Sequence, residues 1–237
     1  MRPLLIVKTG NKLAEAASRP GDFEDWIAAG TGMPRERVRV ARVHEAEPLP
    51  EPQELAGVVV TGAAAMVTDR APWSERTAVW LRGAVEAELP TLGICFGHQL
   101  LGYGCGGEVG PNPRGREIGT VEVVLDAAAA SDPLFRGLEP TLRVHATHVE
   151  SLLRLPPGAR RLASNAHDPN QAFAIGRRAW GVQFHPEFDA ATMRGYLAGR
   201  RAIVAGEGLD PDALSLAVSE TPHGSALLRR FAELLLD

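Results

Sequence analysis

The stretch LGICFGHQ, residues 92–99, decides the fold that this sequence predicts. It follows an apolar run and sets Cys95 between Gly93 and Gly97. This spacing is typical of a nucleophile elbow, a sharp turn from a strand into a helix that exposes the central side chain above a sheet. The free amides and the dipole of a helix beginning near Gly97 favour thiolate over thiol at Cys95. A small buried hydrophobic cysteine is the alternative interpretation.

The residues before this turn alternate between strand-like and helix-like segments. Strands are expected at residues 3–7, 38–43, 55–62 and 89–95, and helices at 23–30 and 72–88. Asp22 is a candidate N-cap, Gly30 a candidate helix stop and Pro72 a candidate first helical residue. Alternation at these lengths predicts an α/β fold with right-handed crossovers. We therefore expect an open, mostly parallel central sheet with flanking helices.

The pattern changes after about residue 107. Strand-like segments joined by turns follow at 116–125, 141–150, 160–166, 171–176 and 179–185, and helical spacing returns at 189–205, 210–219 and 222–236. These predict an antiparallel strand addition and C-terminal helices. We expect residues 1–237 to form one domain, with residues 189–237 as a helical extension. That extension either covers a partner surface or the mouth of a site, or packs as an amphipathic tail against the sheet.

Composition narrows the class of partner. The chain has 237 residues, 45% hydrophobic and 23% charged, with a formal net charge of -4. This charge gives no reason to expect nucleic acid or an anionic membrane, and no apolar run is long enough to span a bilayer. The segment at Met1 does not resemble a secretory signal, and a structural role is expected for Cys105. We expect a cytoplasmic protein that acts on a small molecule.

A second motif, GVQFHPEF at residues 181–188, pairs with the cysteine. His185 and Glu187 are two residues apart, and in extended chain such residues point to the same side. The carboxylate can then hold the imidazole in one tautomer and stabilise the imidazolium formed when His185 takes the Cys95 proton. The alternative interpretation is a surface His-Pro-Glu turn.

GICFGHQLL and GVQFHPEF in this order resemble the class I glutamine amidotransferases, from about residue 55 to 188. The amidotransferase half of GMP synthase is the most similar. The resemblance implies a flavodoxin-like open α/β sheet and hydrolysis of the glutamine carboxamide through a γ-glutamyl thioester. It implies Cys95 as nucleophile, His185 as general base and acid, and Glu187 as the group that orients the histidine. No cofactor is implied.

The resemblance also suggests an oxyanion hole made by the amides of Phe96 and Ala63. The family commonly has Gly-Gly-Pro where this chain has Gly62-Ala63-Ala64, and alanine is less free than glycine to take positive φ. A plain turn at a strand end is the alternative for this segment.

Substrate-binding positions implied by the resemblance are Gly62, Gln99, Thr147 and His148. Gln99 is otherwise a polar residue in a first helical turn. Thr147 and His148 match a Ser-His-Gly-Asp segment of the family, while Val149-Glu150 replace Gly-Asp. For this segment the alternative is a strand end whose histidines have local partners.

Metal chemistry is a rival interpretation of the same residues. A metallohydrolase could draw its ligands from His145, His148, His167, His185 and Glu187. However, neither H-E-x-x-H nor Cys-x-x-Cys occurs, and a zinc site would leave the glycine-flanked cysteine unexplained. We expect no metal.

Three functions remain open at this point. The sequence has neither a G-x-x-x-x-G-K-[ST] loop nor the Ser-Gly-Gly-x-Asp-Ser loop of an ATP-pyrophosphatase, so an ammonia-consuming synthase is expected on another chain. The first function is such an amidotransferase acting on glutamine. The second is a hydrolase of γ-glutamyl amides or peptides with the same triad, and the third is a non-catalytic binding or regulatory module. The oligomeric state is not predicted.

Overall fold

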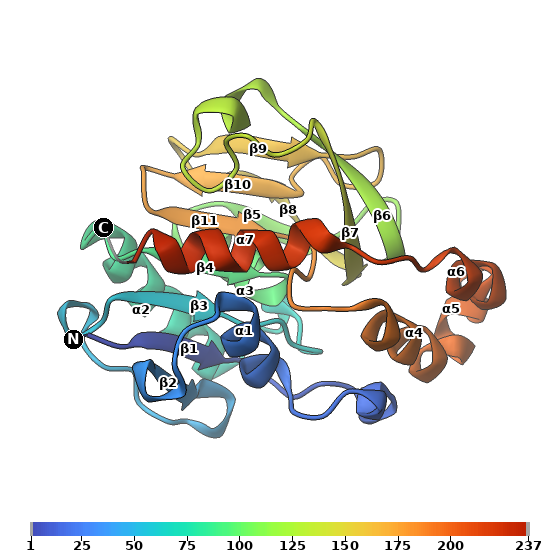
Figure 1. Ribbon diagram of the computed structural model, residues 1–237, viewed down its shortest axis with the longest axis horizontal. Helices are drawn as coiled ribbons and strands as arrows, with labels where there is room; N and C mark the ends of the chain where they lie inside the picture. Colours follow the sequence, from blue (N-terminus) through green and yellow to red (C-terminus); the bar gives the residue numbers. More distant parts are fainter. Residues whose placement is uncertain (1, 236–237) are drawn as a thin grey trace.

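A nine-stranded sheet forms the centre of the computed structural model, which describes residues 2–235 apart from the side chains of residues 17 and 18 (Figure 1). Its parallel half has the spatial order β2 (Val38–Arg42), β1 (Leu4–Lys8), β3 (Gly57–Val60), β4 (Thr91–Ile94) and β11 (Ala179–Val182). Its antiparallel half continues with β10 (Ala172–Ile175), β9 (Arg160–Ser164), β6 (Glu117–Leu125) and β7 (Thr141–His148). The predicted α/β class, with its parallel sheet and antiparallel addition, is confirmed.

Both faces of the parallel strands β1, β3, β4 and β11 are buried, as continuous apolar runs predict, whereas the edge strand β2 is largely half-buried or exposed. In β3, Val59 packs with one hydrophobic cluster, whereas Val58 and Val60 pack with another. The first face is covered by α1 (Phe23–Thr31) and α7 (Pro222–Glu233), and the second by α2 (Pro72–Glu86) and α3 (Phe96–Gly104). In Figure 1, α7 crosses in front of the sheet and α2 and α3 lie behind it.

Helix α1 begins as predicted and ends later than predicted. Asp22 accepts a hydrogen bond from the Phe23 amide at 2.7 Å and donates its own amide to Asp25 at 3.1 Å, which caps the helix. The predicted stop at Gly30 is wrong, because the helix ends at Thr31 and Gly32 takes the left-handed conformation with φ 67°. Gly30 instead permits close packing, since a Cβ there would lie 2.4 Å from a Leu228 methyl carbon of α7.

The segment predicted as a single strand at residues 141–150 is divided at Val149. Its second part, β8 (Glu150–Arg154), leaves the main sheet and pairs antiparallel with β5 (Glu108–Pro111), a short strand that the sequence pattern did not indicate. The break turns the backbone of residues 147–150 past the end of α3. Short 3₁₀ helices lie at Ala14–Ser18, Arg35–Arg37, Val43–Glu45, Pro52–Glu54, Val67–Asp69 and Ala127–Ser131.

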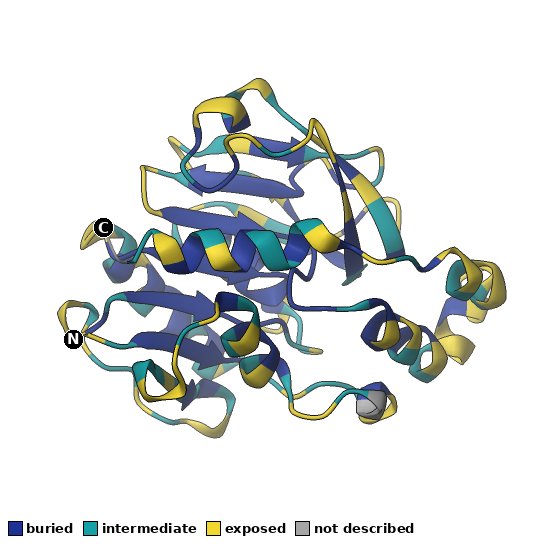
Figure 2. Ribbon diagram, viewed as in Figure 1, coloured by how far each residue is buried: buried dark blue, intermediate teal, exposed yellow. Residues whose placement is uncertain are grey.

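The C-terminal helices divide into two groups. Helix α7 buries Leu227, Leu228 and Phe231 in the main core, and Figure 2 shows its alternating buried and exposed stripes. The predicted helix at 189–205 is instead two helices, α4 (Ala190–Gly199) and α5 (Arg201–Gly206), interrupted at Arg200. With α6 (Pro211–Ala217), they lie at the right of Figure 1. Positions 236 and 237 of the predicted extension lie outside the described residues.

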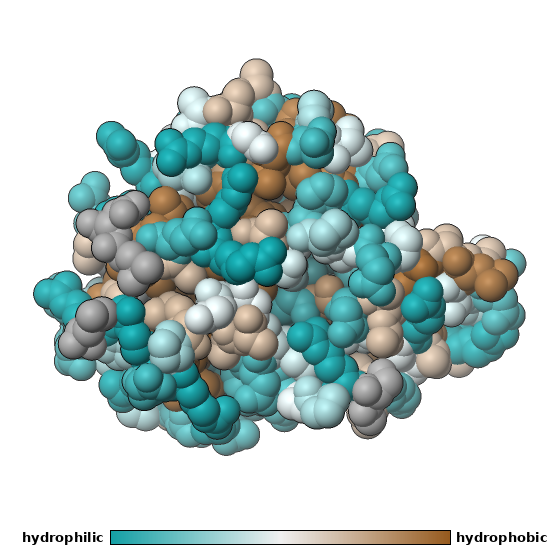
Figure 3. Space-filling model, viewed as in Figure 1, coloured by the Kyte–Doolittle hydropathy of each residue, from teal (hydrophilic) through white to brown (hydrophobic). Residues whose placement is uncertain are grey.

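Helices α5 and α6 carry exposed apolar side chains. Leu216 is 88% exposed, and Ile203 is also exposed. Figure 3 shows apolar surface in this region, at the right of the view. Within residues 2–235, no helix is both long and apolar enough to cross a membrane.

Candidate active site

Cys95 occupies a strained turn between β4 and α3. Its backbone has φ 51° and ψ -104°, a conformation that L-residues rarely adopt, and it is the N-cap of α3. The flanking glycines leave no room for side chains: a Cβ on Gly93 would lie 2.4 Å from the Gly97 carbonyl oxygen, and a Cβ on Gly97 would lie 2.5 Å from that of Val60. This is the geometry of a nucleophile elbow, with the sulfur at a helix N-terminus.

His185 and Glu187 follow the end of β11 and are hydrogen-bonded to each other. His185 Nδ1 donates to Glu187 Oε1 at 2.7 Å, and both side chains are buried. The imidazole stacks on Phe188 with 4.1 Å between ring centroids, which fixes its plane. Its other nitrogen, Nε2, is buried and has no hydrogen-bond partner among the described residues. That nitrogen is therefore free to exchange a proton with a neighbouring group.

Gly62 shows how closely the cysteine and the histidine approach. A Cβ on Gly62 would lie 2.7 Å from His185 Cε1 and 3.6 Å from Cys95 Cβ. The three residues follow β3, β4 and β11, which are adjacent in the sheet, so their carboxyl ends meet at one edge. Backbone hydrogen bonds fix this arrangement, from the Cys95 amide to Val182 at 2.9 Å and from the Gly97 amide to Thr61 at 3.2 Å.

The electrostatics of the site favour a thiolate–imidazolium pair. Burial raises the pKa of Cys95, but the positive charges of His185 and His148 outweigh it and bring the pKa below its usual value. Burial lowers the pKa of His185, but Glu187 and the Cys95 sulfur outweigh it and raise the pKa to about 10. The equilibrium is thus shifted toward the charged, nucleophilic form of the sulfur.

A second buried ion pair lies beside the first. His148 Nε2 donates to Glu117 Oε2 at 2.9 Å, and His148 Nδ1 donates to the Glu150 carbonyl oxygen, also at 2.9 Å. Glu117 also accepts hydrogen bonds from Asn165 and Gln171, each at 2.6 Å. Burial lowers the pKa of His148, but the bond to Glu117 outweighs it and raises the pKa.

This pair changes how His148 takes part in the site. Both of its ring nitrogens are engaged by protein groups, so the ring itself offers no hydrogen bond to a ligand. Sequence patterning could not identify Glu117, because residues 117–119 are all buried and show no alternation.

A cavity of about 60 Å³ adjoins the sulfur. Phe96, Gln99 and Thr147 line it together with Ala63, and the Thr147 carbonyl oxygen lies 3.7 Å from Cys95 Sγ. Gln99 Nε2 donates to the Glu150 carbonyl oxygen at 2.7 Å and to Gln183 Oε1 at 3.0 Å. Both amide hydrogens are then used, and Gln99 Oε1 remains as an acceptor.

The turn at Gly62-Ala63 is built without positive φ at either residue. Glycine at 62 is therefore required by the closeness of His185, and alanine at 63 imposes no backbone strain. The carboxylate of Glu150 stabilises the far end of this turn by accepting from the Val67 amide at 2.9 Å and from the Thr68 hydroxyl. Glu150 thus has a structural contact that the sequence did not suggest.

The histidines and the glutamate considered above as metal ligands do not form a metal site among the described residues. Within the described part of the chain, no three His, Cys, Asp or Glu side chains converge in a way that could hold a metal ion. His145 is held near neutral, because burial and the charge on His185 lower its pKa to about 4.

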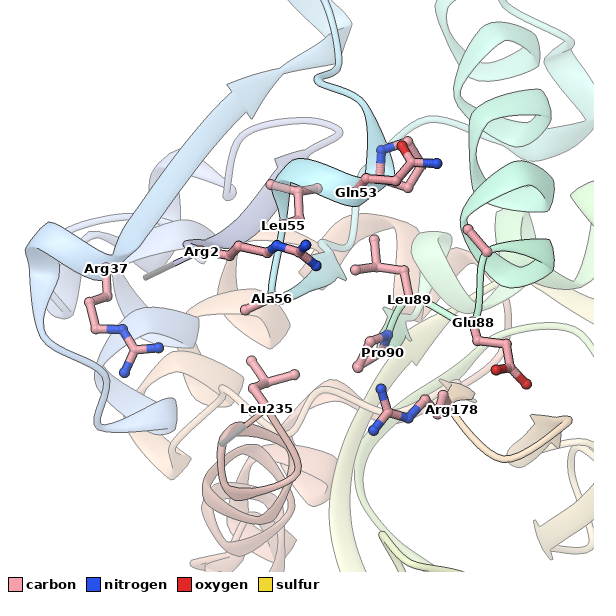
Figure 4. Close-up of a pocket in the computed structure, with 12 residues that line it drawn as sticks. Arg2, Arg37, Gln53, Leu55, Ala56, Glu88, Leu89, Pro90, Arg178 and Leu235 are labelled. Carbon is pink, nitrogen blue, oxygen red and sulfur yellow. The ribbon is translucent and has the colours of Figure 1, made fainter. Parts of the chain in front are cut away.

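A larger cavity lies elsewhere. It has a volume of about 660 Å³ (Figure 4). Among its lining residues, Leu55 lies just before β3, Pro90 just before β4 and Arg178 just before β11. These are the amino ends of the strands, opposite the edge that carries Cys95. None of the predicted site residues lines this cavity.

The family model for class I glutamine amidotransferases matches residues 29–202. The chain belongs to the class I glutamine amidotransferases. This amidotransferase is 42% identical over 99 residues to a glutamine-hydrolysing GMP synthase subunit of Ignicoccus hospitalis, over 41% of this chain and 50% of the relative. It is 34% identical over 151 residues to the corresponding subunit of Thermococcus kodakarensis, over 63% of this chain and 62% of the relative.

A solved structure extends the likeness to the whole fold. The glutamine amidotransferase of Thermotoga maritima superimposes with a TM-score of 0.79 at 23% identity, over 100% of this amidotransferase and 99% of that chain. The two curated relatives are matched over less than two thirds of their length. The similarity therefore establishes family and fold, with the predicted resemblance to GMP synthase confirmed.

The two cysteines of this amidotransferase should differ sharply in alkylation. Cys95 is 5% exposed and Cys105 is more exposed, yet burial raises the pKa of Cys105 to about 11 while that of Cys95 is lowered. At pH 7 only on the order of one Cys105 in ten thousand is thiolate. We expect iodoacetamide at pH 7 to modify Cys95 and spare Cys105, as measured by peptide mass spectrometry.

Two variants serve as controls for this experiment. In Cys105→Ser, Cys95 should be alkylated at the same rate as in the parent protein. In His185→Gln, Cys95 should react more slowly because its thiolate loses the positive charge of the imidazolium. Equal modification of the two cysteines would contradict the proposed ionisation of Cys95.

Proposed function

We propose that this protein hydrolyses the side-chain amide of glutamine to glutamate and ammonia. The observation that carries the proposal is the strained Cys95 at the start of α3 beside a hydrogen-bonded His185–Glu187 pair. A residue held at positive φ at a helix N-terminus is costly to the fold, and such strain is concentrated at functional sites. The charge distribution supports a ready nucleophile.

In the proposed reaction, the Cys95 thiolate attacks the carboxamide carbon and forms a tetrahedral oxyanion. The amides of Phe96 and Ala63 would donate hydrogen bonds to that oxygen. His185 Nε2 then gives its proton to the departing nitrogen, ammonia leaves, and a γ-glutamyl thioester remains. His185 next takes a proton from water, the resulting hydroxide attacks the thioester, and glutamate and the thiolate are restored. Glu187 holds His185 Nδ1–H throughout.

The space beside His185 favours glutamine over a substituted γ-glutamyl amide. A cavity of about 20 Å³ is lined by His185, Phe23 and Tyr196 but not by Cys95. The leaving nitrogen must lie on the His185 side of the carbonyl carbon to receive its proton. The amide nitrogen of glutamine needs little room in this space, whereas a substituted nitrogen requires its lining residues to move apart.

We further propose that the ammonia passes to a synthase on another chain. The two curated relatives are each named as one subunit of a GMP synthase, which supports a division of the reaction between chains. Exposed Ile203, Leu209 and Leu216 on and between α5 and α6 support a protein contact close to the site. Burial of such side chains by a partner removes apolar surface from water and favours association.

The test is a comparison of substrates with purified protein. We expect glutamate release from glutamine to exceed release from γ-glutamylmethylamide and γ-glutamyl peptides by about tenfold or more, because the extra methyl or amino acid must be accommodated. Preference for the substituted amides would identify the protein as a γ-glutamyl hydrolase instead. Failure to hydrolyse any of them, together with no labelling of Cys95 by a glutamine-analogue electrophile, would favour the binding module.

A further inference from the structure

Arg200 occupies the interruption between α4 and α5 and reaches the site from outside the strands that carry the triad. It lines both the cavity beside Cys95 and the cavity beside His185, and among the described residues it is the one charged group common to both. Ala63, Ala64 and Thr147 are the other residues shared by the two cavities. Arg200 therefore lies where the two spaces meet.

The guanidinium of Arg200 has no hydrogen-bond acceptor and no carboxylate partner within residues 2–235. Its Nε is buried and has no hydrogen-bond partner within residues 2–235. Within the same residues, Arg200 forms no ion pair. A buried donor without an acceptor is unfavourable by the loss of its hydration, so the group requires an explanation.

Arg116 provides an internal comparison, because it lines the same cavity but is already paired. Its Nε and Nη2 donate to the two carboxylate oxygens of Glu207 at 2.7 and 2.9 Å. Burial, and then the nearby charge of Arg116, lower the pKa of Arg200. Of the two arginines that line this cavity, Arg116 thus has a carboxylate at hydrogen-bond distance, and Arg200 has none within residues 2–235.

We propose that Arg200 binds the α-carboxylate of the amino-acid substrate and so determines that the site accepts γ-carboxamides that also carry a carboxylate. The planar guanidinium can donate two parallel hydrogen bonds to such a group, which adds geometric selection to charge attraction. A single uncompensated arginine matches a single carboxylate. This inference rests on the proposed function, because it identifies the substrate class of the same site.

A binding role separates Arg200 from the residues that perform the chemistry. The α-carboxylate does not change charge during amide hydrolysis, so the contact stabilises the bound substrate and the transition state alike. Loss of such a contact raises KM and leaves kcat nearly unchanged. A structural role for Arg200 would instead disturb kcat and the reactivity of Cys95 toward small neutral reagents.

The experiment compares Arg200→Met and Arg200→Lys with Arg201→Met. Arg201 is the next residue, is exposed and pairs with Asp212 at 2.6 Å, outside both cavities, so it is the matched control. We expect Arg200→Met to raise KM for glutamine by about ten- to a hundredfold with kcat within a few fold of the parent. Arg200→Lys should recover part of the loss, and Arg201→Met should show none.

Two further measurements exclude indirect effects. Turnover of 4-aminobutanamide, which lacks the α-carboxylate, should be equally slow in the parent and in Arg200→Met. The rate of Cys95 alkylation by iodoacetamide should also be the same in both. A decrease in turnover of the two substrates by the same factor would overturn the inference, as would an unchanged KM for glutamine.

Binding of glutamine to Cys95→Ala, measured by calorimetry, gives a result that does not depend on turnover. In the Cys95→Ala variant, adding Arg200→Met should raise the Kd for glutamine by about the same ten- to hundredfold factor. An unchanged Kd, or no detectable binding to Cys95→Ala, overturns the assignment of Arg200. Intact binding with no glutamate release by the parent protein overturns the proposed glutaminase function and leaves the role of Arg200 standing.

Discussion

Replacing Cys95 by alanine is expected to lower kcat for glutamate release by about a millionfold, to the background of the assay. In the proposed reaction the sulfur forms the covalent bond that divides amide hydrolysis into two easier steps. Among the other residues that line its cavity, Ala63, Phe96 and Thr147 offer only backbone groups or a hydroxyl without an adjacent base. Coupled detection of glutamate measures the loss directly.

The controls for this variant separate chemistry from folding. Alanine keeps the buried volume small and the same strained φ, so the thermal midpoint should remain close to that of the parent. Cys105→Ala removes the other thiol, whose pKa is raised to about 11 by burial, and should retain full activity. Comparable turnover by Cys95→Ala and the parent would end the assignment of Cys95 as nucleophile.

Glu187→Gln is expected to lower kcat by about three to four orders of magnitude while changing KM little. Glutamine is nearly isosteric but carries no charge, so His185 loses the main attraction that raises its pKa to about 10. The pKa of His185 then falls, and the thiolate–imidazolium pair shifts toward thiol and neutral imidazole. The amide nitrogen can also face His185 Nδ1 and favour the wrong tautomer.

Two measurements distinguish this outcome from a general loss of structure. The rate of iodoacetamide reaction at Cys95 near neutral pH should fall, because less of the sulfur is thiolate. The same substitution at the exposed Glu220 should have no effect on either rate. If Glu187→Gln reduces kcat by less than about tenfold, the carboxylate does not orient the base.

Local sequence carried most of the information about the chemistry. Gly93 and Gly97 predict the elbow because both glycines lie within five residues of chain. His185 and Glu187 make the predicted contact, but the expected extended chain is wrong: residues 186–187 form a turn closed by the Phe188 amide on the His185 carbonyl oxygen at 3.3 Å. The parallel sheet follows from apolar runs that are buried on both faces. These features depend on neighbours in sequence, which a pattern can reveal.

The parts that sequence could not supply depend on distant residues. Arg200 lines the same two cavities as Thr147 from the point where a helix expected to be continuous is interrupted. Its proposed role rests on its buried Nε, which has no partner in the described part of the chain. The pairing of Glu117 with His148 joins two strands whose register no local pattern specifies. Gly30 was taken for a helix end because its true constraint, the close approach of Leu228, lies on α7.

The separation of Arg200 from the strand ends has a consequence for descent and diversification. Residues 95, 185 and 187 are fixed by adjacent strands of one sheet, whereas Arg200 and Glu207 belong to a pair of short helices at its edge. On the proposed function, substitutions in this helical segment would change which amide or which partner protein is bound, while the strands that carry residues 95 and 185 keep their sequence.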